Sequence, residues 1–246
     1  MNEEHFRIAT PDNKSIHGVL SKPEEETLRL VILAHGLTGN PFEHLHMVAR
    51  EEFLDNGYAV CQFWFYHEAE DARKLHECSL QLHARDIQNV VSYFKDSFSD
   101  IYLCGHSYGG LSAIICNSPD LKALSLWDPS FKPWAEFWPD CLLEKIHDYN
   151  GYLVTGHFLG LVGKIMVEEA KALSSSESEA YARELKTPCQ LILADRSKNA
   201  IQNDLKDYLI MPEREVIEIA GADHCFIEEQ TAYDLAEAAR EWFDRF

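Results

Sequence analysis

Residues 101–110 read IYLCGHSYGG, and this stretch decides the fold. The apolar run 101–104 predicts a buried strand, and a helical stretch of small residues follows the turn. Ser107 lies at the apex of that sharp turn, between Gly105 and Gly109, where larger side chains would collide with the strand and the helix. A hydroxyl at a strand tip above a helix N-terminus is exposed to substrate, and negative charge is favoured beside it. The pattern therefore predicts a nucleophilic serine.

Strands and helices alternate along the rest of the chain. The nearly continuous apolar run 29–34 is typical of a strand buried on both faces. Apolar residues at helical spacing over 87–94 predict an amphipathic helix. Further strands are expected at 58–65, 123–127, 189–194 and 215–220. The alternation predicts an α/β fold with a mainly parallel, doubly wound sheet in one domain over residues 1–246. Residues 4–9 and 15–20 are expected to form an N-terminal antiparallel hairpin.

The composition excludes several classes of partner. The formal net charge is -19, from 41 acidic and 22 basic residues, and no basic stripe offsets it. Such a surface repels nucleic acid and anionic membranes. The N-terminus does not resemble a signal peptide, and no apolar run has membrane-spanning length. We therefore expect a cytoplasmic protein with no nucleic-acid partner and no membrane span.

The cysteines and histidines do not predict a metal site or a disulfide framework. The seven cysteines include no Cys-x-x-Cys pair, and Cys61, Cys104 and Cys189 fall in strand-like apolar runs. Among twelve histidines, the closest pair is His44 and His46, which lacks the i, i+4 spacing of a helical zinc site. We expect neither a metal nor an organic cofactor.

Residues 130–187 form a long insertion between two expected strands. A segment of this length is too long for a simple connection, which predicts a lid subdomain over the site. Asn150-Gly151 indicates a tight hairpin, a helix is expected over 158–173, and 174–176 resembles a flexible stretch. The aromatic residues in and before the insertion are Trp127, Phe131, Trp134, Phe137 and Trp138. They are expected to line an apolar substrate pocket, the alternative being that they anchor the lid to the body.

A serine nucleophile needs a histidine base and a carboxylate that orients it. Asp195 directly follows the strand 189–194, and His224 lies just past the next strand. Both residues and Ser107 would then emerge at the same edge of a parallel sheet, where open α/β sheets place their sites. We expect Ser107, His224 and Asp195 to be catalytic. Asp128, which also ends a strand, is the alternative acid.

These motifs together resemble the α/β-hydrolase superfamily over essentially the whole chain. The similarity is greatest to small-lid serine esterases, including bacterial cinnamoyl (feruloyl) esterases and monoacylglycerol-lipase-like enzymes. It rests on the Ser107 turn and on three further motifs, His35-Gly36-Leu37-Thr38-Gly39, Ala194-Asp195 and Gly221-Ala222-Asp223-His224. The resemblance implies an oxyanion hole made by the backbone amides of Leu37 and Tyr108. The chain departs from many relatives at 66–70, where they have a glycine-rich turn with serine.

Two further histidines lie near the expected site. His35 and His106 are expected to shape the oxyanion loop and to pack behind the serine turn, rather than to transfer protons. The predicted function is hydrolysis of a small carboxylic ester, apolar or aromatic, through a covalent acyl-enzyme. A serine peptidase or acyltransferase would use the same residues, and a binding protein on a hydrolase scaffold is a third alternative.

Overall fold

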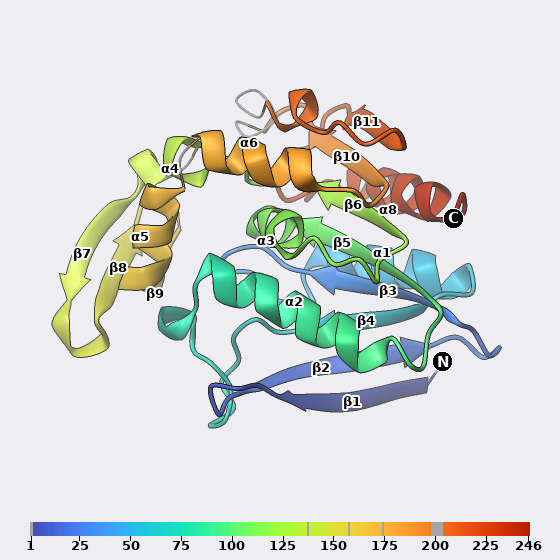
Figure 1. Ribbon diagram of the computed structural model, residues 1–246, viewed down its shortest axis with the longest axis horizontal. Helices are drawn as coiled ribbons and strands as arrows, with labels where there is room; N and C mark the ends of the chain where they lie inside the picture. The colour runs from blue at the N-terminus through green and yellow to red at the C-terminus, as the bar shows by residue number, and fades with distance from the viewer. Residues whose placement is uncertain (1, 137, 157, 174, 198–203) are drawn as a thin grey trace.

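An eight-stranded sheet forms the centre of the fold (Figure 1), in the order β1-β2-β4-β3-β5-β6-β10-β11. The computed structural model describes residues 2–136, 138–156, 158–173, 175–197 and 204–246. The strands are β1 (Asn2–Ala9), β2 (Ser15–Lys22), β3 (Arg29–Ala34), β4 (Ala59–Phe63), β5 (Asp100–His106), β6 (Ala123–Trp127), β10 (Cys189–Ala194) and β11 (Arg214–Ile219). β2 pairs antiparallel with β1 and β4, whereas β4-β3-β5-β6-β10-β11 pair in parallel. This confirms the predicted mainly parallel sheet and its N-terminal antiparallel hairpin.

Helices cover both faces of the sheet (Figure 1). They are α1 (His44–Asp55), α2 (Leu80–Phe94), α3 (Tyr108–Cys116), α6 (Ser175–Glu184) and α8 (Glu229–Phe243). α1 and α8 pack on one face, and α2, α3 and α6 pack on the other. The central strand β3 is buried from Leu30 to Ala34, which explains its unbroken apolar sequence. The doubly wound arrangement brings the carboxyl ends of β3, β5, β6, β10 and β11 to one edge.

The insertion, residues 130–187, lies between β6 and β10 and has its own small sheet. Its elements before α6 are α4 (Pro133–Glu136), η2 (Trp138–Asp140), β7 (Leu142–Ile146), η3 (His147–Tyr149), β8 (Gly151–Thr155), β9 (Gly160–Gly163) and α5 (Lys164–Ala172). β8 pairs antiparallel with both β7 and β9. Asn150 has a left-handed backbone (φ 47°) at the β7–β8 turn, where Asn-Gly predicted a hairpin.

Two expectations for the insertion differ from the structure. The helix expected over 158–173 begins only at Lys164, because residues 160–163 pair with β8 as a strand. The stretch expected to be flexible is in part helical, because α6 begins at Ser175. Ser174 lies outside the described residues.

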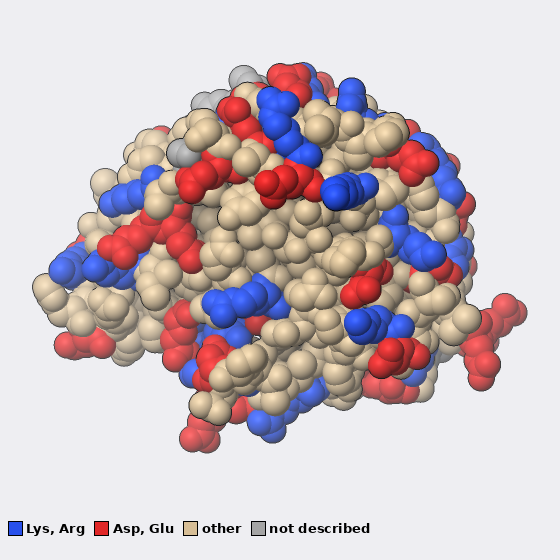
Figure 2. Space-filling view, in the orientation of Figure 1, with Lys and Arg blue, Asp and Glu red and all other residues tan. Residues whose placement is uncertain are grey.

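The surface in Figure 2 carries both signs of charge. Asp and Glu side chains are interspersed with Lys and Arg across the visible face, with uncharged area between them. Within the described ranges, no helix has both the length and the apolar character needed to span a bilayer.

Candidate active site

Ser107 occupies the turn between β5 and α3 in a strained conformation. Its backbone has φ 53° and ψ -121°, a region that residues with side chains rarely adopt. The flanking glycines are sterically required. A Cβ on Gly109 would lie 2.3 Å from the carbonyl oxygen of Ala34, and one on Gly105 would lie 2.8 Å from Cα of Gly110. Close packing of strand and helix therefore holds the hydroxyl at the tip of β5.

A chain of hydrogen bonds leads from Ser107 into the protein. Nε2 of His224 lies 2.9 Å from Oγ of Ser107, and Nδ1 lies 2.5 Å from Oδ2 of Asp128. The Asp128 side chain is fully buried, whereas the His224 side chain is 31% exposed. With the proton on Nδ1, His224 donates to Asp128 and its Nε2 accepts the serine proton. This arrangement can deprotonate the serine and stabilise the imidazolium that results.

The carboxylate that the structure places against His224 is that of Asp128, the alternative acid, and not that of Asp195, the expected one. Asp128 turns out of β6 with a left-handed backbone (φ 37°). Its Oδ1 accepts a hydrogen bond from the Ala194 amide (3.3 Å), so the carboxylate is fixed between β10 and His224. Asp195 instead follows the end of β10, and its amide donates to the carbonyl of Ile219 (3.4 Å) at the end of β11. No described residue is a partner for its buried Oδ1.

The loop after β3 lies against the serine. A Cβ on Gly36 would lie 3.1 Å from Cβ of Ser107. The loop turns sharply, with Thr38 at φ 62° and the Gly39 amide donating to the Gly36 carbonyl (3.2 Å). Among the described residues none accepts a hydrogen bond from the Leu37 amide. Leu37 thus offers a backbone donor beside the first turn of α3, where Tyr108 is the first residue.

Two buried histidines support this edge of the sheet. His35 donates from Nδ1 to the Gly36 carbonyl (2.9 Å) and accepts at Nε2 from the Phe65 amide (3.2 Å). Nε2 of His106 donates to the carbonyl of His224 (2.8 Å). Burial lowers the pKa of His35 to about 4 and that of His106 to about 3, so both stay neutral near pH 7. Their contacts agree with the supporting roles expected for them.

Tyr66 contacts the loop after β3 through both its hydroxyl and its ring. Its hydroxyl donates to the carbonyl of Gly39 (2.9 Å), and its ring contacts His35 edge-on at 5.2 Å between centroids. Burial raises the pKa of this hydroxyl, which therefore stays protonated and able to donate. Tyr66 falls in the segment where the chain departs from many relatives, and no motif indicated its role.

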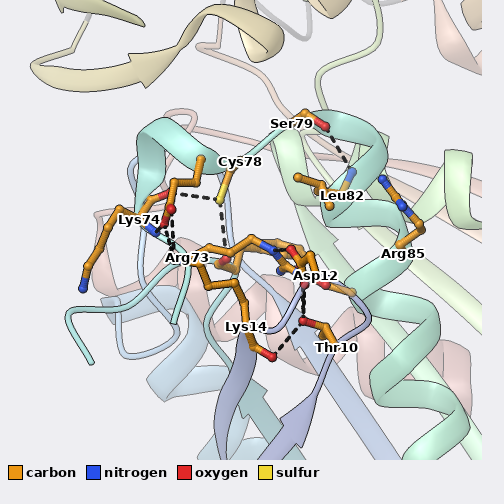
Figure 3. A network of polar contacts seen from close by, with 12 residues as sticks. Thr10, Asp12, Lys14, Arg73, Lys74, Cys78, Ser79, Leu82 and Arg85 are labelled. Carbon is orange, nitrogen blue, oxygen red and sulfur yellow. Dashed lines mark hydrogen bonds and ion pairs between the residues drawn. The ribbon is translucent and has the colours of Figure 1, made fainter. Parts of the chain in front are cut away.

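Arg73 links the segment that contains Tyr66 to two other parts of the fold through hydrogen bonds and ion pairs (Figure 3). The guanidinium donates to Asp12 (2.8 Å) and Thr10 (3.1 Å) in the β1–β2 turn, and it also pairs with buried Asp86 of α2. The side chains of Arg73 and Asp86 are only 4% and 1% exposed. Removing either partner would therefore leave a buried charge unpaired and destabilise the fold. This network links the N-terminal hairpin, α2 and the segment that supports the site.

The aromatic residues expected to line a pocket lie in different surroundings. Trp127 is fully buried on the face of the sheet that α1 and α8 cover, with its ring stacked on His46 at 6.0 Å between centroids, and Phe131 is fully buried near Tyr208. Trp138 is buried and donates from Nε1 to the Tyr108 hydroxyl (3.1 Å). Trp134 is partly buried and stacks on Trp138 at 6.2 Å. Phe137 lies outside the described residues.

The described residues include no group of three or more His, Cys, Asp or Glu side chains placed to hold a metal ion. The chemistry visible at this edge of the sheet is that of a serine, a histidine and a carboxylate.

Comparison with known proteins finds one matching family and several solved structures with the same fold. The sequence profile of the alpha/beta hydrolase family matches residues 31–238. None of the curated proteins matches the chain. Est1E from Butyrivibrio proteoclasticus, solved with ferulic acid bound, is 20% identical with a TM-score of 0.77, over 98% of each chain. The esterase domain of a Rhodothermus marinus protein is 17% identical with a TM-score of 0.78, over 100% of this chain and 99% of that one. The Pyrococcus furiosus esterase Pf2001 is 19% identical with a TM-score of 0.73, over 100% of this chain and 93% of that one.

Proposed function

Because the chain belongs to the alpha/beta hydrolase family, we propose that it is a serine hydrolase that cleaves carboxylic esters through a covalent acyl-enzyme. The observation that carries this proposal is the unbroken chain of hydrogen bonds from Ser107 through His224 to Asp128. Each group needed for nucleophilic catalysis is then in contact with the next before substrate binds.

In the proposed reaction, Oγ of Ser107 attacks the ester carbonyl while Nε2 of His224 takes the hydroxyl proton. The tetrahedral intermediate collapses when the C–O bond to the alcohol breaks, and His224 returns the proton to the leaving alcohol oxygen. Water then attacks the acyl-serine, with His224 again as base, and the carboxylic acid and free Ser107 are regenerated. Asp128 orients His224 and stabilises its imidazolium in both halves.

The negative oxygen of each intermediate needs hydrogen-bond donors in place beforehand. We assign this role to the backbone amides of Leu37 and Tyr108. The contact of Gly36 with Ser107 supports the assignment of Leu37, and the position of Tyr108 at the start of α3 supports the other. The helix N-terminus adds a favourable dipole at the same point.

For the substrate we propose a small ester with an apolar or aromatic group, covered by the insertion as a lid. The insertion shares a buried cluster with Tyr108 and Leu111 of α3, so it packs beside the serine turn. Similarity to structures described as esterases, one with ferulic acid bound, supports an ester with an aromatic acid. Among the aromatic residues expected to line the pocket, Trp134 is partly buried, and we assign it the contact with such a group.

The test is ester turnover by purified protein with a panel of p-nitrophenyl esters that vary in acyl length and aromaticity. Ser107→Ala and His224→Ala should each lower kcat by several orders of magnitude, and the double variant should lose little more. Circular dichroism and thermal melts serve as folding controls. Turnover near the wild-type rate in either folded single variant would refute the mechanism.

A further inference from the structure

The loop that follows Asp128 passes directly beside the nucleophile. The amide of Ser130 donates to the carbonyl of Ser107 (3.0 Å), and Ser130 is fully buried. Pro129 packs so closely on α3 that a Cβ on Gly110 would lie 2.6 Å from its ring. The position of this loop therefore affects both Asp128 at its start and the backbone of Ser107.

The carboxylate of Glu136 holds the far end of that loop. It accepts hydrogen bonds from the amides of Phe131 (3.0 and 3.1 Å) and Lys132 (2.8 Å). Glu136 is only 6% exposed, and within the described part of the chain no Lys or Arg forms an ion pair with it. Lys132 pairs instead with Asp204 (2.7 Å) and Glu179 (3.5 Å). A carboxylate buried without a cation is costly, and backbone amides offset only part of that cost.

Burial raises the pKa of Glu136 to about 7, and the hydrogen bonds from the two amides oppose that rise. These bonds to the amides of Phe131 and Lys132 hold the side chain against the loop.

We propose that Glu136 is a positioning residue for the reaction, which fixes the 128–132 loop and thereby the placement of Asp128 and of the Ser107 backbone. This inference rests on the proposed function, because the loop matters to turnover only if Ser107 and Asp128 take part in it. Misplacement of a reacting group slows the chemical step more than it weakens substrate binding, so the effect should fall on kcat.

The test compares Glu136→Gln, Glu136→Asp and the control Glu77→Gln. Glu77 also accepts a backbone amide hydrogen bond, from Lys74 (2.7 Å), but it lies in the turn η1 (Leu75–Glu77), away from His224. The readout is kcat and KM for p-nitrophenyl acetate from mildly acidic to mildly alkaline pH, with thermal melts alongside. Glutamine keeps the shape and one acceptor but loses the charge, whereas aspartate keeps the charge on a shorter side chain.

We expect Glu136→Gln to lower kcat about tenfold with KM within about twofold of wild type. Glu136→Asp should show a smaller loss of kcat, because it keeps a carboxylate that can still accept from the amides, and Glu77→Gln should match wild type in both kcat and KM. If Glu136→Gln does not fold, Glu136→Asp decides, because a wild-type kcat or a rise in KM alone in that variant contradicts the proposal.

A wild-type kcat in folded Glu136→Gln, or a lower melting temperature with no change in kcat, would reduce Glu136 to a structural role and overturn the inference. Failure of the proposed function is a different result, because wild-type protein would then not turn over esters at all.

Discussion

Trp138 donates a hydrogen bond from Nε1 to the hydroxyl of Tyr108 (3.1 Å) and thereby joins the insertion to the residue that follows Ser107. Both side chains are buried, in a cluster that also contains Leu111 of α3 and Val154 of β8. The insertion is thus attached to the body at the point where the proposed oxyanion hole is built. Of the two roles considered for the aromatic residues, this contact favours the anchoring role for Trp138, while Trp134 is the residue that we propose contacts substrate.

Trp134→Ala should therefore raise KM more for bulky aromatic esters than for acetyl esters, by about tenfold, because it removes apolar contact with the larger group. The matched control is Trp138→Phe, which keeps an aromatic ring but loses the N–H donor. It should lower the free energy of unfolding by about 1 kcal/mol and affect both ester classes alike. Steady-state kinetics on two esters, with thermal melts, gives both readouts, and equal KM changes for Trp134→Ala would remove it from the pocket.

Asp128→Asn should lower kcat by roughly 10⁴-fold, because the orienting carboxylate sets the tautomer of His224 and stabilises its imidazolium. Asp195→Asn should remain within a few-fold of wild type. The comparison needs only kcat for one activated ester and a circular dichroism spectrum of each variant. The reverse ranking of the two asparagine variants would return the acid to Asp195.

Tyr66→Phe should lower kcat about tenfold and leave KM nearly unchanged. The reason is that the lost hydroxyl donates to the Gly39 carbonyl and so fixes the loop that carries Leu37, whose amide is one of the two proposed oxyanion donors. A matched variant is Tyr93→Phe, at a half-exposed tyrosine of α2, which should behave as wild type. If Tyr66→Phe changes KM and not kcat, the hydroxyl contacts substrate rather than supporting the oxyanion loop.

His83 predicts a pH-dependent stability. It is 1% exposed and stacks on Phe65 at 4.1 Å, and no described residue is a partner for either ring nitrogen. Burial holds its pKa well below the usual 6.5, so below that pH the unfolded chain takes up a proton that the folded chain refuses. The stability is full above about pH 6.5 and falls as the pH decreases.

His83→Phe should remove this contribution while keeping a ring of similar shape. As the pH is lowered from 8 to 5, the variant should become more stable relative to wild type and melt at a higher temperature than wild type. The difference in unfolding free energy should grow by on the order of 1–2 kcal/mol. His5→Phe, at an exposed histidine of β1, is the control and should show no such trend. A melting difference that is constant across pH would mean that His83 is not buried in its neutral form.

Much of the fold was predictable because the patterns involved are local. The apolar runs at 29–34 and 189–194 reflect strands that are buried on both faces. The turn at Ser107 was recognisable because strand and helix pack so closely there that only glycine fits at 105 and 109. The strand 160–163 was missed because it is short and continues into α5, so its apolar residues fit a helical period equally well.

The acid could not be decided from sequence for a different reason. Asp128 and Asp195 both follow neighbouring parallel strands, β6 and β10, and their positions along the chain are equivalent. What separates them is the left-handed backbone of Asp128 and its contact with the Ala194 amide, both products of tertiary packing. The sequence also contained no sign of the contacts made by Tyr66, Arg73 and Glu136. Each of these contacts depends on a partner from another element or on a loop geometry that no motif encodes.

The central claim, that Ser107 is a nucleophile activated by His224, is tested most directly by covalent labelling with a fluorophosphonate. Intact-mass spectrometry of wild-type protein should show one added phosphonyl group, and peptide mapping should place it on Ser107. Ser107→Ala should remain unlabelled, and His224→Ala should label at least about a hundredfold more slowly. A folded wild-type protein that stays unmodified under conditions that label a known serine esterase, or one labelled at another residue, would contradict the account.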